Sequence, residues 1–387
     1  MAHGRCETPA MLRQKGVSFR RMARIPLLLT WIVLTGLVAA EEQAPALPAE
    51  LSDEDFWQLI VDVSEPDGHF EDENFVSNEM GYQRVMRRLQ EAVQPEGVYV
   101  GVGPEQNFSY IAALRPKMAF VVDIRRQNMI EHLMYKALFE LSDDRVDFLS
   151  RLFSRRRPAG LDRQSNTVDL FQAFGTAPPD RQLFDGTFTR MLDVLVRQHR
   201  FGLTADDQAA LRKVFTAFYE SGPNIRYVFR GTAEPHPTYA QLMTPLEGGR
   251  NWSYLGSNDS FDRIRTMQRR NLIVPVVGDF AGPKALRALG VYVRERGGTV
   301  NVFYASNVEA NLFRAGTWKA FYDNVSTLPV HDAGMFVRTF FGATARECSA
   351  QRPTIRTPVL ASMTALLAAY RRGELKSQCD LVAASDR

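Results

Sequence analysis

The stretch Val98–Arg126, VYVGVGPEQNFSYIAALRPKMAFVVDIRR, shows the organisation of this chain most clearly. An apolar run leads into Gly101 and Gly103, a helical segment follows from about Asn107, and a second apolar run ends at Asp123. Two buried strands joined through a short helix are typical of a βαβ unit, in which the strands are parallel. The stretch therefore predicts an α/β fold built on a parallel sheet.

The residues at the ends of these two strands suit a nucleotide-type ligand. Gly101 and Gly103 would let the backbone approach a ligand, and the helix that begins near Asn107 would present free N–H groups. Asp123 lies 22 residues after Gly101, where its carboxylate could accept hydrogen bonds from both ribose hydroxyls. An alternative remains open, in which these residues contact no ligand. The glycines would then simply make a tight turn, and Asp123 would cap a helix or pair with a following arginine.

The same alternation resumes later in the chain. A strand expected over Leu272–Val277 precedes Asp279, and a strand expected over Thr299–Ala305 precedes Asn307 and Glu309. Ligands of open α/β sheets bind beyond the carboxyl ends of the strands, so we expect these polar residues to share one crevice with the loops of the first unit. Asp279 could instead cap the next helix.

Helical segments surround the two α/β parts. Apolar spacing predicts a helix over Phe75–Val93, and several helices are expected over about 140–250. An insertion of this size could cover the ligand edge of the sheet as a lid, or it could be a structural cap without ligand contact. The predicted divisions are a signal segment at 1–40, a linker at 41–50, N-terminal helices at 51–95, an α/β domain at 96–345 that contains the insertion, and a C-terminal helical segment at 346–387.

Residues 25–40, IPLLLTWIVLTGLVAA, form an uncharged apolar run that follows three arginines. The run is shorter than the roughly 20 residues that a membrane-spanning helix needs, and it ends in small residues that a signal peptidase accepts. We predict a secretory signal cleaved near Ala40, which would place the mature protein in the periplasm or outside the cell. The alternative is an uncleaved anchor, and only in that case would the protein associate with a membrane. Translation could also start at Met22.

Cysteine usage agrees with export. Cys6 would leave with the signal, so the mature chain would keep only Cys348 and Cys379, on either side of a helix expected over Pro358–Arg372. These two thiols could join in a bridge that would stabilise the C-terminal segment by roughly 3–4 kcal/mol in the chain-entropy model, or they could be unrelated.

Composition and motifs argue against several classes of function. The first 40 residues hold six basic residues and one acidic residue, so the rest of a chain whose formal charge is +3 carries a net charge of −2. A chain that is slightly acidic beyond residue 40 lacks the basic surface that nucleic-acid binding requires, so no nucleic-acid partner is expected. The histidines show no metal-ligand spacing, so no metal site is predicted. Neither a GxSxG nor a GxxxxGK[ST] motif occurs.

The order of these motifs (strand, GxG, helix, strand, Asp; then strand, Gly-Asp, helix, strand, Asn) resembles the class I S-adenosylmethionine-dependent methyltransferase fold. The resemblance implies a Rossmann-like parallel sheet flanked by helices, with S-adenosylmethionine as the cofactor. It implies that the loop of Gly101, Gly103 and Asn107 holds the methionine part of the cofactor. It also implies that Asp123 binds the ribose and that Asp279 lies beside the adenine.

The resemblance further implies that Asn307 and Glu309 are catalytic residues, which line the reaction centre and orient the methyl acceptor. VGVGPEQNFSYIAALRPKMAFVVDIRR and FYASNVE are also similar to an uncharacterised bacterial family of exported or membrane-associated proteins that is assigned this fold. The similarity covers roughly residues 75–345.

The chain departs from the methyltransferase pattern at its first loop, where Tyr99 replaces an acidic residue and Pro104 and Glu105 follow Gly103. Pro104 has no N–H to offer, and Glu105 would bring negative charge toward a cofactor carboxylate. Two functions therefore remain open. The first is an exported protein that binds a small molecule or an envelope component in the crevice at the carboxyl edge of the sheet. The second is an S-adenosylmethionine-dependent methyltransferase that acts on an unknown acceptor.

Overall fold

The computed structural model describes residues 46–72, 74–228, 236–341, 348 and 358–385. The chain divides into two units, Met1–Gln43 and Ala44–Arg387, and all described residues belong to the second. The predicted signal segment at 1–40 therefore lies outside the described residues. Within the described ranges, no helix is long and apolar enough to cross a membrane.

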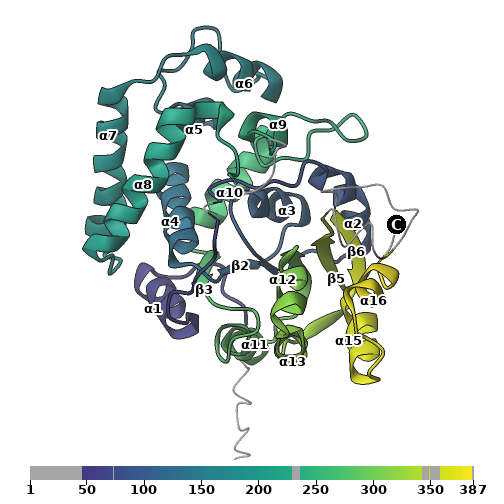
Figure 1. Ribbon diagram of the computed structural model, residues 1–387. Coiled ribbons are helices and arrows are strands. Elements are labelled where there is room, and N and C mark those ends of the chain that lie inside the picture. Colours follow the sequence, from purple (N-terminus) through teal and green to yellow (C-terminus); the bar gives the residue numbers. More distant parts are fainter. Residues whose placement is uncertain (1–45, 73, 229–235, 342–347, 349–357, 386–387) are drawn as a thin grey trace, which may run out of the picture. The chain divides into compact units, whose positions relative to one another are not determined.

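The described unit is built on one mixed sheet of six strands in the order β3-β2-β1-β4-β5-β6 (Figure 1). The first five of these strands pair in parallel, whereas β6 pairs with β5 antiparallel. Strands that alternate with helices and pair mostly in parallel confirm the predicted α/β class. The strands are β1 (Val98–Gly101), β2 (Met118–Asp123), β3 (Ile273–Val277), β4 (Val300–Ser306), β5 (Val330–Thr339) and β6 (Pro358–Ser362).

The edge strand β6 corrects one expectation. The helix predicted over Pro358–Arg372 is wrong in its first part, because Pro358–Ser362 is a strand. Proline has no N–H to donate, and it is tolerated at the first residue of an edge strand. Helix α15 begins only at Met363, where Ser362 Oγ accepts a hydrogen bond of 3.2 Å from the backbone N–H of Ala365 and caps the helix.

The helix predicted over Phe75–Val93 is also wrong in its first part. Only the 3₁₀ turn η1 (Tyr82–Val85) and helix α2 (Met86–Ala92) are helical. The preceding residues run as an irregular segment because the backbone N–H of Ser77 donates to the carboxylate of Glu105, at 3.1 Å, and not into a helical turn. This irregular segment becomes part of the candidate site described below.

Helices cover the sheet and extend outward from it. Helix α4 packs on β2 and β3, α1 packs on β3 and α11, and α15 packs on β5. These and the remaining helices are α1 (Asp53–Val63), α3 (Gln106–Leu114), α4 (Arg126–Leu141), α5 (Arg145–Phe153), α6 (Thr167–Thr176), α7 (Arg181–Leu192), the π-helix η2 (Asp193–Gln198), α8 (Ala205–Ser221), η3 (Gly222–Asn224), α9 (Tyr239–Met243), α10 (Asn258–Arg269), α11 (Ala285–Glu295), α12 (Val308–Ala315), α13 (Trp318–Val325), α15 (Met363–Arg371) and α16 (Gln378–Ala383).

Helices α5 to α9, with η2 and η3, lie between about 140 and 250, where the insertion was predicted. Helices α5, α7 and α8 pack on α4, and Figure 1 shows them on the side away from α11 and α13. An aromatic cluster joins this layer to the sheet-facing helices: Phe139 lies 4.6 Å from Phe148 and 5.3 Å from Phe261, between ring centroids, and Phe148 lies 6.2 Å from Tyr254. Aromatic pairs at these distances add packing energy beyond their buried area. The insertion is therefore anchored mainly on α4.

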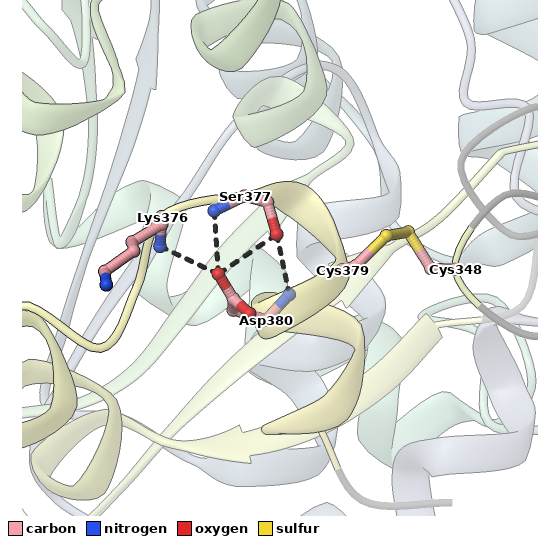
Figure 2. Close-up of a disulfide and its surroundings, with 5 residues drawn as sticks. All are labelled: Cys348, Lys376, Ser377, Cys379 and Asp380. Carbon is pink, nitrogen blue, oxygen red and sulfur yellow. Dashed lines mark hydrogen bonds between the residues drawn. A yellow bond between two sulfur atoms is a disulfide. The ribbon is translucent and has the colours of Figure 1, made fainter.

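A disulfide joins Cys348 to Cys379 near the C-terminus (Figure 2). Their Cα atoms lie 4.8 Å apart, and the predicted bridge is thus confirmed. Helix α16, which carries Cys379, starts with a capping box, in which Ser377 and Asp380 each accept a hydrogen bond from the backbone N–H of the other. Disulfides persist in oxidising compartments, so the bridge favours a location outside the cytoplasm.

Candidate functional site

A cavity of about 410 Å³ lies at the carboxyl ends of β1, β2, β3 and β4. The strand order reverses between β1 and β4, and this topological switch point is where open α/β sheets bind ligands. The volume lies within the range of roughly 300–1,000 Å³ that is typical of small-molecule pockets. Position and size therefore make this cavity the candidate site.

Residues from four separate loops meet around the cavity. Gly103 follows β1, Asp123 ends β2, Asp279 follows β3 and Asn307 follows β4, and all four line the cavity. The structure thus brings the loops of the two separated α/β parts into one crevice. The roles of these residues toward a ligand remain predictions.

Gly101 and Asn107 do not line the cavity, and they shape its first loop from inside. Asn107 Nδ2 donates to three consecutive loop carbonyls at 2.7–3.0 Å, and the Tyr99 hydroxyl donates to its Oδ1 at 2.9 Å. A Cβ on Gly101 would lie 2.0 Å from Asn107 Oδ1, so this glycine makes room for the asparagine. Gly103 is different, because its φ is +75° and an added Cβ would meet no atom within 4 Å. Of the two glycines of the predicted first loop, the structure therefore favours Gly103 as the one that a ligand could approach.

Asp123 lines the cavity as one half of an ion pair. Its Oδ1 accepts hydrogen bonds from the backbone N–H and the Nε of Arg125, at 3.0 and 3.1 Å, and its Oδ2 accepts one from the same guanidinium at 3.3 Å. Burial acts to lower the pKa of Arg125, but the Asp123 carboxylate outweighs this effect and raises it. Pairing with a following arginine, one of the alternatives considered for Asp123, is therefore present. A ligand hydroxyl would have to share this carboxylate with Arg125.

Glu105 does not bring its charge into the cavity, contrary to the expectation from the first loop. Its side chain is fully buried, and burial raises the pKa of its carboxyl to about 8. Behind the same loop, His132 Nε2 lies 2.9 Å from the carbonyl oxygen of Gly103, and burial lowers the pKa of this histidine to about 4. The loop after β1 is therefore supported by uncharged groups on its inner side.

An irregular segment contributes to the cavity lining with His69, Phe70, Asn74, Val76, Ser77 and Asn78, and we refer to residues 64–72 and 74–80 as the roof segment. Its Glu65 carboxylate accepts hydrogen bonds from the backbone N–H groups of Asp279, Lys284 and Ala285 at 2.7–2.9 Å. The groups of Lys284 and Ala285 lie at the start of α11, where a carboxylate is favoured by the helix dipole. Glu65 thus fastens the roof segment to the loop that follows β3.

A second set of contacts fastens the roof segment to the end of β2. The backbone N–H of Gly68 donates to the carbonyl of Ile124 at 2.8 Å, and Asp67 accepts a hydrogen bond of 2.7 Å from the backbone N–H of Arg126. Tyr227 reaches in from the insertion, and its hydroxyl donates to Asp72 at 2.8 Å. Of the described residues between 140 and 250, only Tyr227 lines the cavity. The insertion therefore contributes a single described side chain to the cavity lining, and its role as a lid or as a structural cap stays a prediction.

A buried polar network forms the β4 side of the cavity. Ser306 Oγ donates to Glu79 Oε1 at 2.5 Å, and Gln106 Nε2 donates to Glu79 Oε2 at 2.8 Å and to the Tyr304 hydroxyl at 3.1 Å. Ser77 of the roof segment in turn donates to Gln106 Oε1. Glu79 is fully buried, and burial raises the pKa of its carboxyl. Ser77, Tyr304 and Ser306 all line the cavity, so the network connects directly with it.

Glu309 is not part of the cavity lining, and the structure does not support its predicted catalytic role. Its Oε2 lies 3.0 Å from Arg338 Nε, and its Oε1 accepts a hydrogen bond from the Tyr322 hydroxyl. Both ion-pair partners are almost completely buried, at 3% exposed for Glu309 and 0% for Arg338. Asn307 and Glu309 are two residues apart at the start of α12, and side chains at this spacing do not share a helix face.

Sequence reasoning missed the roof segment and the pair of Ser306 and Glu79. The acidic, Pro- and Gly-containing stretch after α1 was a sign of an irregular segment, but nothing in it indicated what the segment covers. In the described part of the chain, no group of three or more His, Cys, Asp or Glu side chains could hold a metal ion.

The model of a family called domain of unknown function DUF7790 matches residues 74–168 and 170–359. The match covers most of the chain and includes the four strand-end loops of the cavity together with Glu79 and Ser306. No curated protein matches the chain. The chain belongs to the DUF7790 family of domains of unknown function.

Proposed function

We propose that the protein is an exported binding protein that holds a neutral, ring-bearing polar molecule of nucleoside size in the cavity. The observation that carries the proposal is the convergence of Gly103, Asp123, Asp279 and Asn307 on one cavity at the switch point of the sheet. A mostly apolar pocket with a few convergent polar groups is the usual form of a small-molecule site.

The lining favours a neutral ligand over an anionic one. The guanidinium of Arg125 is paired with Asp123 in the cavity wall, so these two charges largely cancel. Asp279 accepts a backbone hydrogen bond of 2.9 Å from Ala281 and keeps acceptor capacity for a ligand hydroxyl or amino group. Rings and amides supply the other contacts: the aromatic lining residues are Phe70, Tyr227, Phe280 and Tyr304, and the asparagines are Asn74, Asn78, Asn307 and Asn311.

Export is supported by two independent features. The apolar run at residues 25–40 ends in small residues, as a cleaved signal does. The disulfide between Cys348 and Cys379 suits an oxidising compartment. Fractionation of cells that express the full chain tests this part of the proposal. A soluble envelope form that lacks residues 1–40 is expected, whereas a soluble cytosolic form that retains residues 25–40 would contradict it.

An S-adenosylmethionine-dependent methyltransferase is the second candidate. The strand order β3-β2-β1-β4-β5 follows the doubly wound arrangement, and Asp123 and Asp279 lie after the strands where the resemblance expects the ribose and adenine sites. Methyl transfer from a sulfonium depends largely on positioning, so the cavity would not need a strong base. We rank this function second because Pro104, which lines the cavity beside Gly103, has no N–H to offer the carboxylate of the cofactor.

Calorimetric titration of the full chain, purified with its disulfide formed, distinguishes the candidates. Adenosine, S-adenosylmethionine and S-adenosylhomocysteine are the probes. We expect adenosine to bind, and we expect Asn307→Ala to weaken binding at least tenfold. The matched control is Asn224→Ala, at an exposed asparagine that does not line the cavity. S-adenosylhomocysteine that binds at least tenfold more tightly than adenosine would favour the methyltransferase. The absence of binding by all three would contradict the proposed ligand class.

A further inference from the structure

Ser306 has an unusual place among the residues with left-handed backbone. Six non-glycine residues of the described chain have positive φ, and the five others lie shortly after the end of a helix, where this conformation is common. Ser306, with φ of +49°, is instead the last residue of β4, and α12 begins two residues later. The pairing of β4 with β5 also shifts register between Tyr304 and Ser306. Strain and bulges of this kind concentrate at functional sites, where they aim a side chain.

The Ser306 hydroxyl is aimed at a carboxylate. Ser306 Oγ lies 2.5 Å from Glu79 Oε1, and the other oxygen of Glu79 is held by Gln106 Nε2 at 2.8 Å. A hydroxyl bonded to a base, with the base oriented by a third group, is the general arrangement of an activated nucleophile. Ser306 lines the cavity, so a bound molecule could reach its hydroxyl.

The surroundings of Glu79 suit a base. The groups that face it are the hydroxyls of Ser306, Tyr304 and Thr339, the amide of Gln106, and the more distant phenols of Tyr99 and Tyr110. No salt bridge to Glu79 occurs in the described part of the chain, and burial raises its pKa, which makes its ionised form a stronger proton acceptor.

The start of α12 could stabilise a developing negative charge. Asn307 and Val308 line the cavity beside Ser306, and the side chain of Asn307 makes no capping hydrogen bond to the first turn. The first N–H groups of a helix lack partners within the helix and can bind an oxyanion. The start of α12 would assist the pair of Ser306 and Glu79, and the assignment of this pair does not depend on it.

We propose that Ser306 is the nucleophile of an acyl-transfer reaction in the cavity, with Glu79 as its general base and Gln106 as the residue that positions Glu79. The substrate class is a small neutral carboxylic ester. This inference rests on the proposed function, because the ester must enter the same cavity that we assign to a neutral ligand.

The reaction balances with water as the second substrate. Ser306 Oγ forms a bond to the ester carbonyl carbon while its proton moves to the Glu79 carboxylate. The bond to the leaving alcohol then breaks, and the alcohol oxygen takes the proton from Glu79. Water attacks the acyl-serine and gives a proton to Glu79, and Ser306 regains a proton as the carboxylic acid leaves. The net change is ester plus water to acid plus alcohol.

Labelling with a fluorophosphonate probe, which reacts with activated serines and releases fluoride, tests the proposal. Peptide mass spectrometry should locate the label on Ser306. Ser306→Ala and Ser306→Gly should both lose it, and the glycine variant suits the positive φ and guards against misfolding. Glu79→Gln should slow labelling at least 100-fold, as expected for loss of a general base. Ser221→Ala, at an exposed serine that ends α8, should label like the wild type.

The positioning role of Gln106 has its own readout. The hydrogen bond from Gln106 lowers the pKa of Glu79 against the effect of burial, so Gln106→Met should shift the rise in labelling rate to higher pH. An unchanged pH profile would contradict this role. The Gln106→Met variant still carries the Glu79 carboxylate, so its pH profile tests the general base even if Glu79→Gln fails to fold.

Adenosine titration of the same samples separates this inference from the proposed function. A wild-type protein that binds adenosine but is not labelled at Ser306 would overturn the nucleophile and leave the binding function intact. A label on Ser306 without adenosine binding would support the nucleophile and contradict the proposed ligand class. Labelling that Glu79→Gln leaves unchanged would overturn the assignment of the base.

Discussion

The loop after β1, the first wall, and the turn after β4, the second wall, line the same cavity, yet they are built in opposite ways. In the first wall, polar side chains turn inward: Asn107 bonds to loop carbonyls and Glu105 bonds to the backbone of Ser77. In the second wall, Ser306 has a strained backbone, and Asn307 is half-buried and lines the cavity.

The difference indicates that the recognisable motif and the polar side chains of the β4 turn lie in different loops. The loop after β1 carries the glycines of the motif, but the side chains of Glu105 and Asn107 are bonded within the protein and do not line the cavity. Ser306 and Asn307 line the cavity at the end of β4, where the sequence pattern is weaker. We therefore expect changes in the first wall to affect mainly stability, and changes in the second wall to affect mainly ligand chemistry.

The largest expected effect concerns the pH dependence of stability through Glu105. Its pKa is raised from 4.5 to about 8 in the folded protein, so the folded state keeps the proton longer than the unfolded state. The contribution of Glu105 to stability is therefore full below pH 4.5 and is lost as pH rises toward 8, by an amount on the order of 5 kcal/mol. Glu105→Gln should flatten this fall in urea unfolding measured from pH 4.5 to 8. Glu295→Gln, at an exposed glutamate, is the control. Equal pH profiles for wild type and Glu105→Gln would contradict the burial argument.

A pair of glycine variants tests the packing of the first wall. Gly101→Ala should lower the free energy of unfolding by about 3 kcal/mol, because the new Cβ would overlap the side chains of Asn107 and Tyr99. Gly103→Ala should cost only about 1 kcal/mol, because the space is open and only the positive φ is unfavourable. Urea unfolding measures both. Equal losses would mean that the loop relaxes around Gly101, and the first wall would then not be rigid.

A pair of asparagine variants compares the two walls directly. Asn107→Ala should destabilise the protein by about 2 kcal/mol, because it leaves the Tyr99 hydroxyl and buried carbonyls without their partner. Asn307→Ala should change stability by less than about 0.5 kcal/mol, since Asn307 is half-buried and caps nothing. Thermal unfolding with adenosine titration checks both. If Asn307→Ala proved the more destabilising variant, the contrast between the walls would be wrong.

Much of the fold could be predicted because local sequence patterns indicate its strands and helices. The apolar runs that became β1 to β4 alternate with helices, and this alternation is typical of parallel sheets. The pairing of Cys348 with Cys379 could be anticipated because few other cysteines were available. The helix prediction over Phe75–Val93 was wrong in its first part, because the apolar spacing that defines η1 and α2 does not predict where the helical part begins.

The candidate site could be predicted only in part. Gly103, Asp123, Asp279 and Asn307 meet because the carboxyl ends of parallel strands share one edge, a rule that needs no side-chain detail. Glu309 could not be separated from Asn307 by sequence, because its inward orientation depends on Arg338, which lies on another strand.

The amino-acid sequence by itself determined the α/β class and the sheet edge at which Gly103, Asp123, Asp279 and Asn307 meet, since these follow from periodicity and from the direction of parallel strands. Only the tertiary structure decided that the roof segment lines the cavity at this edge, that Asp123 is paired with Arg125, and that Glu79 meets Ser306. These contacts join residues of separate elements, in the case of Glu79 and Ser306 more than 200 positions apart. Their energies arise from burial and hydrogen bonding, which no local pattern records.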